Sequence, residues 1–264
     1  MKLISRVTVF GLLLALPLSS MAWGLIGHRV VGEIAWGYMT PQAKKTVQQI
    51  LGDESLAMAT NWADFIKSDP SYRYLGNWHY INFKSGISEK DMRNYLRSDT
   101  ATDAYTRMNF LVKELKNKTL PADKKLFYLR MLIHIAGDLQ QPMHTARPDD
   151  QGGNAIKIDW FGKATNLHSM WDEQLIEFQQ LSYTEYAKVI NHPTAADKTK
   201  WQKESIADWI VDSYRITESL YKEIESAPGN KLSYRYNFDH LKTLDNQLLK
   251  GGVRLGALLN QLFG

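Results

Sequence analysis

Two short segments place a histidine and an aspartate four residues apart: HIAGD, from His134 to Asp138, and HSMWD, from His168 to Asp172. On a helix, residues four apart lie one above the other on the same face, as two ligands of one metal ion require. A solvated ion pair or a hydrogen-bonded core histidine gives the same spacing. The spacing alone leaves metal binding and these simpler explanations open.

The surroundings of His134 favour a compensated polar site. This histidine lies in the apolar segment YLRMLIHIAGDLQQPMH, and a second histidine, His144, follows just after Pro142. Burying an imidazole and a carboxylate there without partners would be costly. A metal ion or a tight hydrogen-bond network would remove that cost.

Three further candidates lie upstream: His28 in WGLIGH, Asp64 in NWADFIK and His79 in GNWHYINF. Taken singly, Asp64 is better explained as an exposed helix residue and His79 as a hydrogen-bonded histidine in an aromatic loop. Together, five of the seven histidines occur with aspartates in short motifs. Imidazoles and carboxylates without thiolates suit zinc, with more than one ion if all eight side chains bind, whereas oxygen-only sites for magnesium or calcium fit poorly.

Most of the chain that must position these residues has helical periodicity. Apolar spacing and capping signals predict helices at 27–39, 40–51, 56–68, 103–116, 124–141, from about 166, 205–225 and 240–262. The segment 124–141 is apolar nearly all round and should be central. In 152–166, alternating residues at 156–160 between glycines predict a short strand or hairpin. The expected fold class is all-α, a mainly α-helical single domain with one short β-hairpin.

The first 22 residues have the order of a secretory signal peptide. Lys2 and Arg6 form a basic head, an apolar stretch follows, and Ser20-Met21-Ala22 ends it with small residues. A membrane anchor is the alternative, but the apolar stretch is shorter than the roughly 20 residues that span a bilayer. Cleavage after Ala22 would give Trp23 a free α-amine. The prediction is a cleaved segment 1–22 and one domain, 23–264.

Composition limits the partners of the mature chain. Removing residues 1–22 from 264 leaves 242, and losing Lys2 and Arg6 lowers the net charge from +4 to +2. This charge is too small to bind duplex DNA by itself, so affinity for phosphates must come from a local site. Cysteine is absent, so the exported chain would fold without disulfides, and metal ions could cross-link it instead.

The motifs occur in a recognisable order. W-G-x-x-G-H from Trp23, WADFIK, WHYINF, HxxxDxxQPxH, GGN and NLHxxWD resemble the S1/P1 family of zinc-dependent, single-strand-specific nucleases, over the stretch from Trp23 to Asp172. The resemblance implies a phospholipase C/P1 nuclease-like fold. The absence of cysteine differs from the disulfide-bearing eukaryotic members, and we expect a bacterial, periplasmic or secreted protein.

The resemblance also implies three zinc ions per chain and their ligands. The first ion would be bound by Asp64, His79, His134 and Asp138; the second by the amine and carbonyl of Trp23, by His28 and by bridging Asp138; the third by His144, His168 and Asp172. Removal of the signal peptide would then complete the site, because an amide nitrogen within the chain is a very weak zinc ligand.

The same resemblance suggests how substrate is bound and cleaved. The ions would activate water and stabilise the leaving 3′ oxygen, giving 5′-mononucleotides, with Asp64 orienting the water and Lys67 beside the scissile phosphate. Tyr80 and Asn154 would contact the base. Asn82 stands where many members have an acidic residue, which leaves base preference open. A solvated Lys67 and an ordinarily packed Tyr80 remain alternatives.

The expected partners are single-stranded DNA and RNA and 3′-mononucleotides, and we expect a monomer. Two other functions are consistent with parts of the sequence. A zinc-dependent phospholipase C resembles this family, although its first histidine lies further from the tryptophan and its last ligand is typically glutamate. A non-catalytic zinc-binding protein would not need Lys67, Tyr80 or Asn154.

Overall fold

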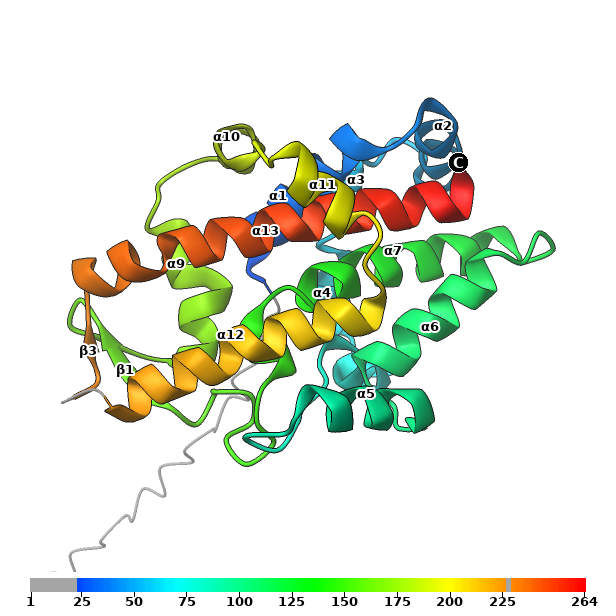
Figure 1. Ribbon diagram of the computed structural model, residues 1–264. Helices are drawn as coiled ribbons and strands as arrows, with labels where there is room; N and C mark the ends of the chain where they lie inside the picture. The colour runs from blue at the N-terminus through cyan, green and yellow to red at the C-terminus, as the bar shows by residue number, and fades with distance from the viewer. Residues whose placement is uncertain (1–22, 227–228) are drawn as a thin grey trace, which may run out of the picture.

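The computed structural model describes residues 23–226 and 229–264, and the predicted signal segment lies outside them. Three long helices organise the fold: α1 (Leu25–Tyr38), α7 (Ala122–Asp138) and α13 (Tyr234–Phe263). In Figure 1, α13 spans the molecule, with α12 (Ile206–Ser226) on one side of it and α1 behind it. One hydrophobic cluster extends from Trp23 to Leu259, and the mainly helical fold class is confirmed.

Small residues bring α13 close to α1. A Cβ atom at Gly252 would lie 2.3 Å from Ile34 Cγ2, and one at Gly256 would lie 2.9 Å from the carbonyl oxygen of Ala35. These glycines are four residues apart and therefore lie on the same face of α13. Their lack of side chains lets the two helices pack backbone to backbone and fixes the position of α1, which carries His28.

Helix α7 is central, as its apolar sequence predicted. Every residue from Met131 to Asp138 is buried. The predicted helix reached residue 141, but α7 ends at Asp138, and Gln141 has an extended backbone with ψ of 120°. Pro142 explains the difference, because a residue that precedes proline is disfavoured in the helical conformation. The 3₁₀ helix η3 (Pro142–Thr145) follows.

The predicted single helix at 56–68 is wrong. The structure has three short pieces there, α3 (Leu56–Ala59), α4 (Trp62–Phe65) and the 3₁₀ helix η1 (Ile66–Ser68), followed by the 3₁₀ helix η2 (Pro70–His79). The first break falls at Thr60, whose hydroxyl donates to the carbonyl of Ala57 at 2.6 Å. Such local bonds by threonine compete with regular helix.

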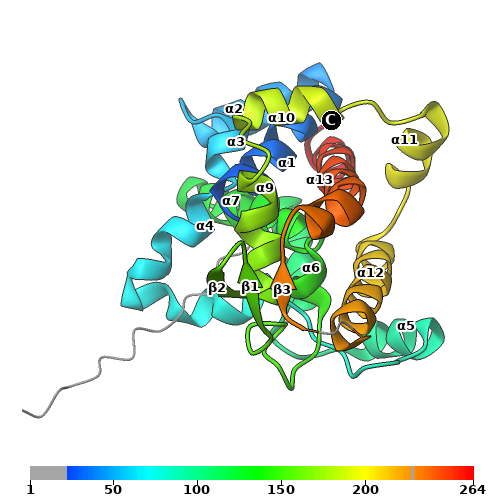
Figure 2. The same cartoon turned by 90° about the vertical axis from the view of Figure 1, so that its left-hand side faces the viewer.

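The predicted hairpin is confirmed as β1 (Lys157–Trp160) paired antiparallel with β2 (Lys163–Asn166). Both residues of its turn, Phe161 and Gly162, have positive φ angles, 52° and 84°, as in the tight turns that suit twisted strands. A third strand, β3 (Lys231–Leu232), pairs parallel with β1 and was not predicted. Figure 2 shows the order β2-β1-β3.

The remaining elements cover this framework. They are α2 (Pro41–Leu51), α5 (Glu89–Ser98), α6 (Ala104–Leu115), α8 (Leu167–Ser169), the π-helical turn η4 (Met170–Gln174), α9 (Leu175–Glu177), α10 (Tyr183–Ile190) and α11 (Ala195–Trp201). The helix predicted from about 166 corresponds to α8, η4 and α9 in succession, and the last helix begins at Tyr234 rather than His240. Within the described ranges, no helix is both long and apolar enough to cross a bilayer.

The N-terminus of α6 contains an acidic residue whose titration should affect stability. Asp103 accepts a hydrogen bond from the amide of Thr106 at 3.0 Å and caps the helix. Burial, followed by a hydrogen bond with Asp99, raises the pKa of Asp103 to about 7. The native state therefore binds a proton that the unfolded state has already lost, and this contribution to stability disappears as the pH rises from about 4 to 7.

We predict that Asp103→Asn keeps the cap and removes this pH dependence, because asparagine caps helices as well as aspartate does. Relative to wild type, the variant should gain on the order of 1 kcal/mol of unfolding free energy between pH 4.5 and pH 8. Urea unfolding of both proteins in a chelator would measure the difference. Parallel stability profiles for the two proteins would contradict the prediction.

Candidate metal centre and cleft

The eight histidine and aspartate side chains that the sequence singled out converge in the core. Each is buried, with at most 9% of its surface exposed. They come from seven elements, so only the tertiary fold brings them together: His28 from α1, Asp64 from α4, His79 from η2, His134 and Asp138 from α7, His144 from η3, His168 from α8 and Asp172 from η4.

Their side-chain nitrogens and oxygens form three groups. Within each group these atoms all lie within 4.8 Å of one another, close enough to surround one ion. The groups are His28, Asp64 and His134; His79, His134 and Asp138; and His144, His168 and Asp172. The first two share His134, so they form one continuous polar cluster beside the third.

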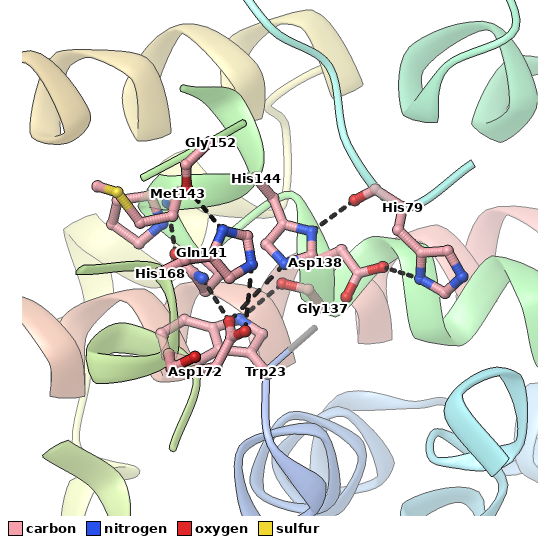
Figure 3. A network of polar contacts seen from close by, with 12 residues as sticks. Trp23, His79, Gly137, Asp138, Gln141, Met143, His144, Gly152, His168 and Asp172 are labelled. Carbon is pink, nitrogen blue, oxygen red and sulfur yellow. Dashed lines mark hydrogen bonds and ion pairs between the residues drawn. The ribbon is translucent and has the colours of Figure 1, made fainter. Parts of the chain in front are cut away.

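Backbone carbonyls fix three of the imidazole rings. The Nδ1 atoms of His134, His144 and His168 each lie 2.6 Å from a carbonyl oxygen. These oxygens belong to Thr60, His79 and Gly152 respectively. Figure 3 shows the bonds of His144 and His168. If Nδ1 carries the proton and donates it to the carbonyl, Nε2 keeps its lone pair and faces the cluster. Metal-binding histidines are held in this way.

Several buried atoms of the cluster make no hydrogen bond among the described residues. They include both ring nitrogens of His28, Nε2 of His79 and of His144, and Oδ1 of Asp138. Each buried polar atom without a partner costs on the order of 1–3 kcal/mol. Because the atoms converge and are nitrogens and carboxylate oxygens, a metal ion is the partner that fits them.

Asp138 lies between several imidazoles. Its Oδ1 is 3.3 Å from Nε2 of His28, while its Oδ2 is 3.0 Å from Nδ1 of His79 and 3.3 Å from Nε2 of His134. Although burial alone would raise the pKa of Asp138, the neighbouring histidines, His134 first, hold it well below its usual range. An ionised carboxylate whose two oxygens face different imidazoles is suited to bridge two cations.

The protonation states of His134 and Asp64 also suit metal binding. Burial lowers the pKa of His134 to about 3, so its imidazole is neutral near pH 7 and can donate a lone pair. Burial opposes ionisation of Asp64, but its interactions with the neighbouring imidazoles, that of His134 first, and with the Lys67 ammonium lower its pKa to about 2. His134 therefore offers a neutral imidazole, and Asp64 and Asp138 offer ionised carboxylates.

Trp23 is anchored beside the cluster. Its buried indole donates from Nε1 to the carbonyl of Gly137 at 2.7 Å, and the amide of Gly24 donates to the carbonyl of Asp172 at 2.7 Å. A Cβ atom at Gly137 would lie 2.9 Å from Nδ1 of His28, so this position must stay small. These contacts hold the start of the described chain between Gly137, the neighbour of Asp138, and Asp172. Binding of a metal by the Trp23 amine stays a prediction.

A cleft of about 920 Å³ opens above the histidines. The four residues predicted to contact substrate all line it: Lys67, Tyr80, Asn82 and Asn154. Tyr80 is 38% exposed, which excludes ordinary core packing, and its hydroxyl donates to Oδ1 of Asn77 at 2.9 Å. Lys67 Nζ lies 2.5 Å from Oδ1 of Asp64, so Lys67 is part of the centre rather than a solvated helix residue.

Comparison with known protein families supports this arrangement. The family model described as S1/P1 Nuclease matches residues 23–264. The chain belongs to the S1/P1 nuclease family. As a member of that family it is a nuclease, a hydrolase that cleaves phosphodiester bonds.

Similar proteins occur in plants and fungi. Endonuclease 2 of Arabidopsis thaliana is 27% identical, with 92% of this chain and 91% of that protein covered. Nuclease S1 of Aspergillus oryzae is 26% identical, with 94% of each covered, and nuclease P1 of Penicillium citrinum is 27% identical, with 92% and 98% covered. The likeness extends across the C-terminal third, which carried no motif of its own.

One positioning residue of this nuclease was missed in the sequence. Gln141 is fully buried, its amide donates from Nε2 to Oδ1 of Asp172, and its Oε1 accepts from the amide of Met143 at 2.5 Å. Gln141 thus positions the Asp172 carboxylate directly. Through the backbone amide of Met143 it also positions η3, which carries His144. The sequence signal that could have indicated this role is the place of Gln141 between Asp138 and His144 in HxxxDxxQPxH.

Replacing Gln141 with methionine should loosen the group formed by His144, His168 and Asp172. Removing such a supporting hydrogen bond typically lowers metal affinity by about 10–100-fold, and a chelator competition titration would measure the loss. The matched control is Gln247→Met. Gln247 is also buried, but it donates to the carbonyl of Gln140 at 2.8 Å and to Oγ of Ser213 at 3.2 Å, neither of which belongs to the three groups. Equal losses in both variants would refute the positioning role.

Proposed function

We propose that this nuclease is a zinc enzyme that hydrolyses single-stranded DNA and RNA to 5′-mononucleotides and also removes phosphate from 3′-mononucleotides. The observation that carries the proposal is the cluster of three adjacent His/Asp groups beneath a cleft with an exposed tyrosine. The relatives named nuclease S1 and nuclease P1 support the same reaction class.

Three zinc ions per chain fit the donor set. All the side-chain donors are imidazoles and carboxylates, which favour zinc over magnesium or calcium. The proposed ligands remain those implied by the resemblance, with Asp138 shared between two ions and the Trp23 amine completing one of them. The close approach of three imidazoles to Asp138 supports its shared role.

When bound, the ions would supply an activated water and charge neutralisation at the phosphate. Asp64 would orient the water, since its carboxylate lies at the edge of the cluster next to His28 and His134. Lys67 lines the cleft beside Asp64, where its charge would stabilise the additional negative charge of the transition state.

Base recognition would depend on stacking against Tyr80. An exposed aromatic ring binds any unpaired base, whereas the faces of paired bases are already covered. Asn82 lines the cleft, where its amide would contact a base edge. The side chain of Asn154 donates to the carbonyl of Gln151 at 2.9 Å, which would leave its oxygen for the base.

Export follows from the proposed signal peptide. The family match begins at Trp23, the residue that cleavage after Ala22 would expose. A monomer in the periplasm or outside a bacterial cell remains our expectation. The family match favours the nuclease over a phospholipase C, and Lys67 and Tyr80 in the cleft favour catalysis over zinc storage.

The direct test uses mature protein beginning at Trp23. We expect about three zinc ions per chain and hydrolysis of single-stranded DNA and RNA to 5′-mononucleotides, with duplex DNA cleaved much more slowly and activity lost in chelator. Phosphatidylcholine serves as the competing substrate. Lipid cleavage alone would favour the phospholipase, and zinc binding without turnover would favour a storage protein.

Retention of one extra residue before Trp23 should lower activity by about tenfold or more, because the amine becomes an amide that binds zinc very weakly. The measurement compares zinc content and hydrolysis of protein starting at Ala22 with protein starting at Trp23. Adding one alanine after Gly264 is the control for an extra terminal residue. Full activity of the N-terminally extended protein would exclude the Trp23 amine as a required ligand.

A further inference from the structure

The cleft has cations but no carboxylate on its walls. Lys67, Arg73 and Lys157 are among the described residues that line it, and aspartate and glutamate are absent from that lining. The whole chain has a net charge of only +4, so this local excess is not a property of the surface in general. A cleft lined by one sign of charge concentrates counter-ions, here the phosphates of a nucleic acid.

Arg73 differs from the other arginines. In 23–226 and 229–264 every other arginine has a hydrogen bond, an ion pair or a ring contact, or, in the case of Arg29, faces the side-chain amide of Asn61, whereas the structure shows none of these for Arg73. It is exposed on the cleft wall, whereas Lys67 is paired with Asp64. The five donors of its guanidinium are therefore available for a phosphate.

The backbone of Arg73 lies at a distance from that of His79 in the metal centre. It precedes His79 by six residues in η2, and a 3₁₀ helix rises about 2.0 Å per residue, so their Cα atoms are about 12 Å apart along the axis. His79 and Gly152 lie at opposite ends of the polar network, with His144 between them (Figure 3). Arg73 therefore approaches the cleft from the His79 side, and Lys157, which follows the Gly152 turn, from the other.

The size of the cleft allows for more than one nucleotide. Its volume of about 920 Å³ is near the upper end of the roughly 300–1,000 Å³ of small-molecule pockets. We propose that Arg73 binds a backbone phosphate next to the one that is hydrolysed, so that the cleft favours strands of several nucleotides over the smallest substrate. This inference rests on the proposed nuclease activity on single strands.

The test compares Arg73→Gln with wild type on two substrates: a single-stranded oligonucleotide of about ten nucleotides, and a dinucleoside monophosphate, whose only phosphate is the scissile one. We expect KM for the oligonucleotide to rise about tenfold with kcat unchanged, and the dinucleoside monophosphate to be hydrolysed as by wild type. Loss of one phosphate contact should also make the plot of log kcat/KM against log salt concentration shallower by about 0.7 for a single strand.

Arg97→Gln is the matched control, because Arg97 is an exposed arginine on α5 that bonds Asn94 and does not line the cleft. It should change neither KM nor the salt slope. For Arg73→Lys, the oligonucleotide KM and the salt slope should lie between those of wild type and Arg73→Gln, since lysine keeps the charge but loses the planar guanidinium. An unchanged oligonucleotide KM and salt slope, or an equal loss on both substrates, would overturn the role of Arg73. Wild-type protein inactive on both substrates would overturn the proposed function instead.

Discussion

The fold buries a polar cluster at the centre of an apolar core, and the free-energy cost of burying these groups must be offset by partners. Five imidazoles and three carboxylates are buried where α1, α7 and the short helices meet. Burial drives the imidazole of His134 to its neutral form and opposes ionisation of the carboxylates, but the neighbouring imidazoles and Lys67 keep the pKa values of Asp138 and Asp64 low. The cluster can thus bind cations, and the close packing of α13 on α1 fixes the position of His28 in it.

Irregular backbone does much of the positioning. The break at Thr60 provides the carbonyl that fixes His134, the end of η2 provides the carbonyl of His79 for His144, and the turn at Gly152 provides the one for His168. Gly152 has a φ of 66°, and a Cβ atom there would lie 2.8 Å from the carbonyl of Met143, so glycine is required. Asp172 lies in a π-helical turn, a feature often found at functional sites.

These features also explain which parts were predictable. The pairs on α7 and at 168–172 follow from helical periodicity, and the hairpin from alternation between glycines, because both signals are local. The break at Thr60 opposes a continuous apolar pattern, and the two-residue strand β3 has too few residues for any pattern. The carbonyl acceptors have no side-chain signature, and the partners of Gln141 and the isolation of Arg73 become visible only when distant segments are placed together.

The distribution of charge connects the metal centre to substrate binding. Three aspartates belong to the buried groups beneath the cleft and do not line it, while its walls carry Lys67, Arg73 and Lys157. Without divalent cations, the ionised base would repel a phosphate that the walls attract. Divalent cations bound at the base would reverse its sign, so that base and walls would attract the same anion. A chain with little net charge can therefore bind a polyanion locally, in a manner that depends on its metal content.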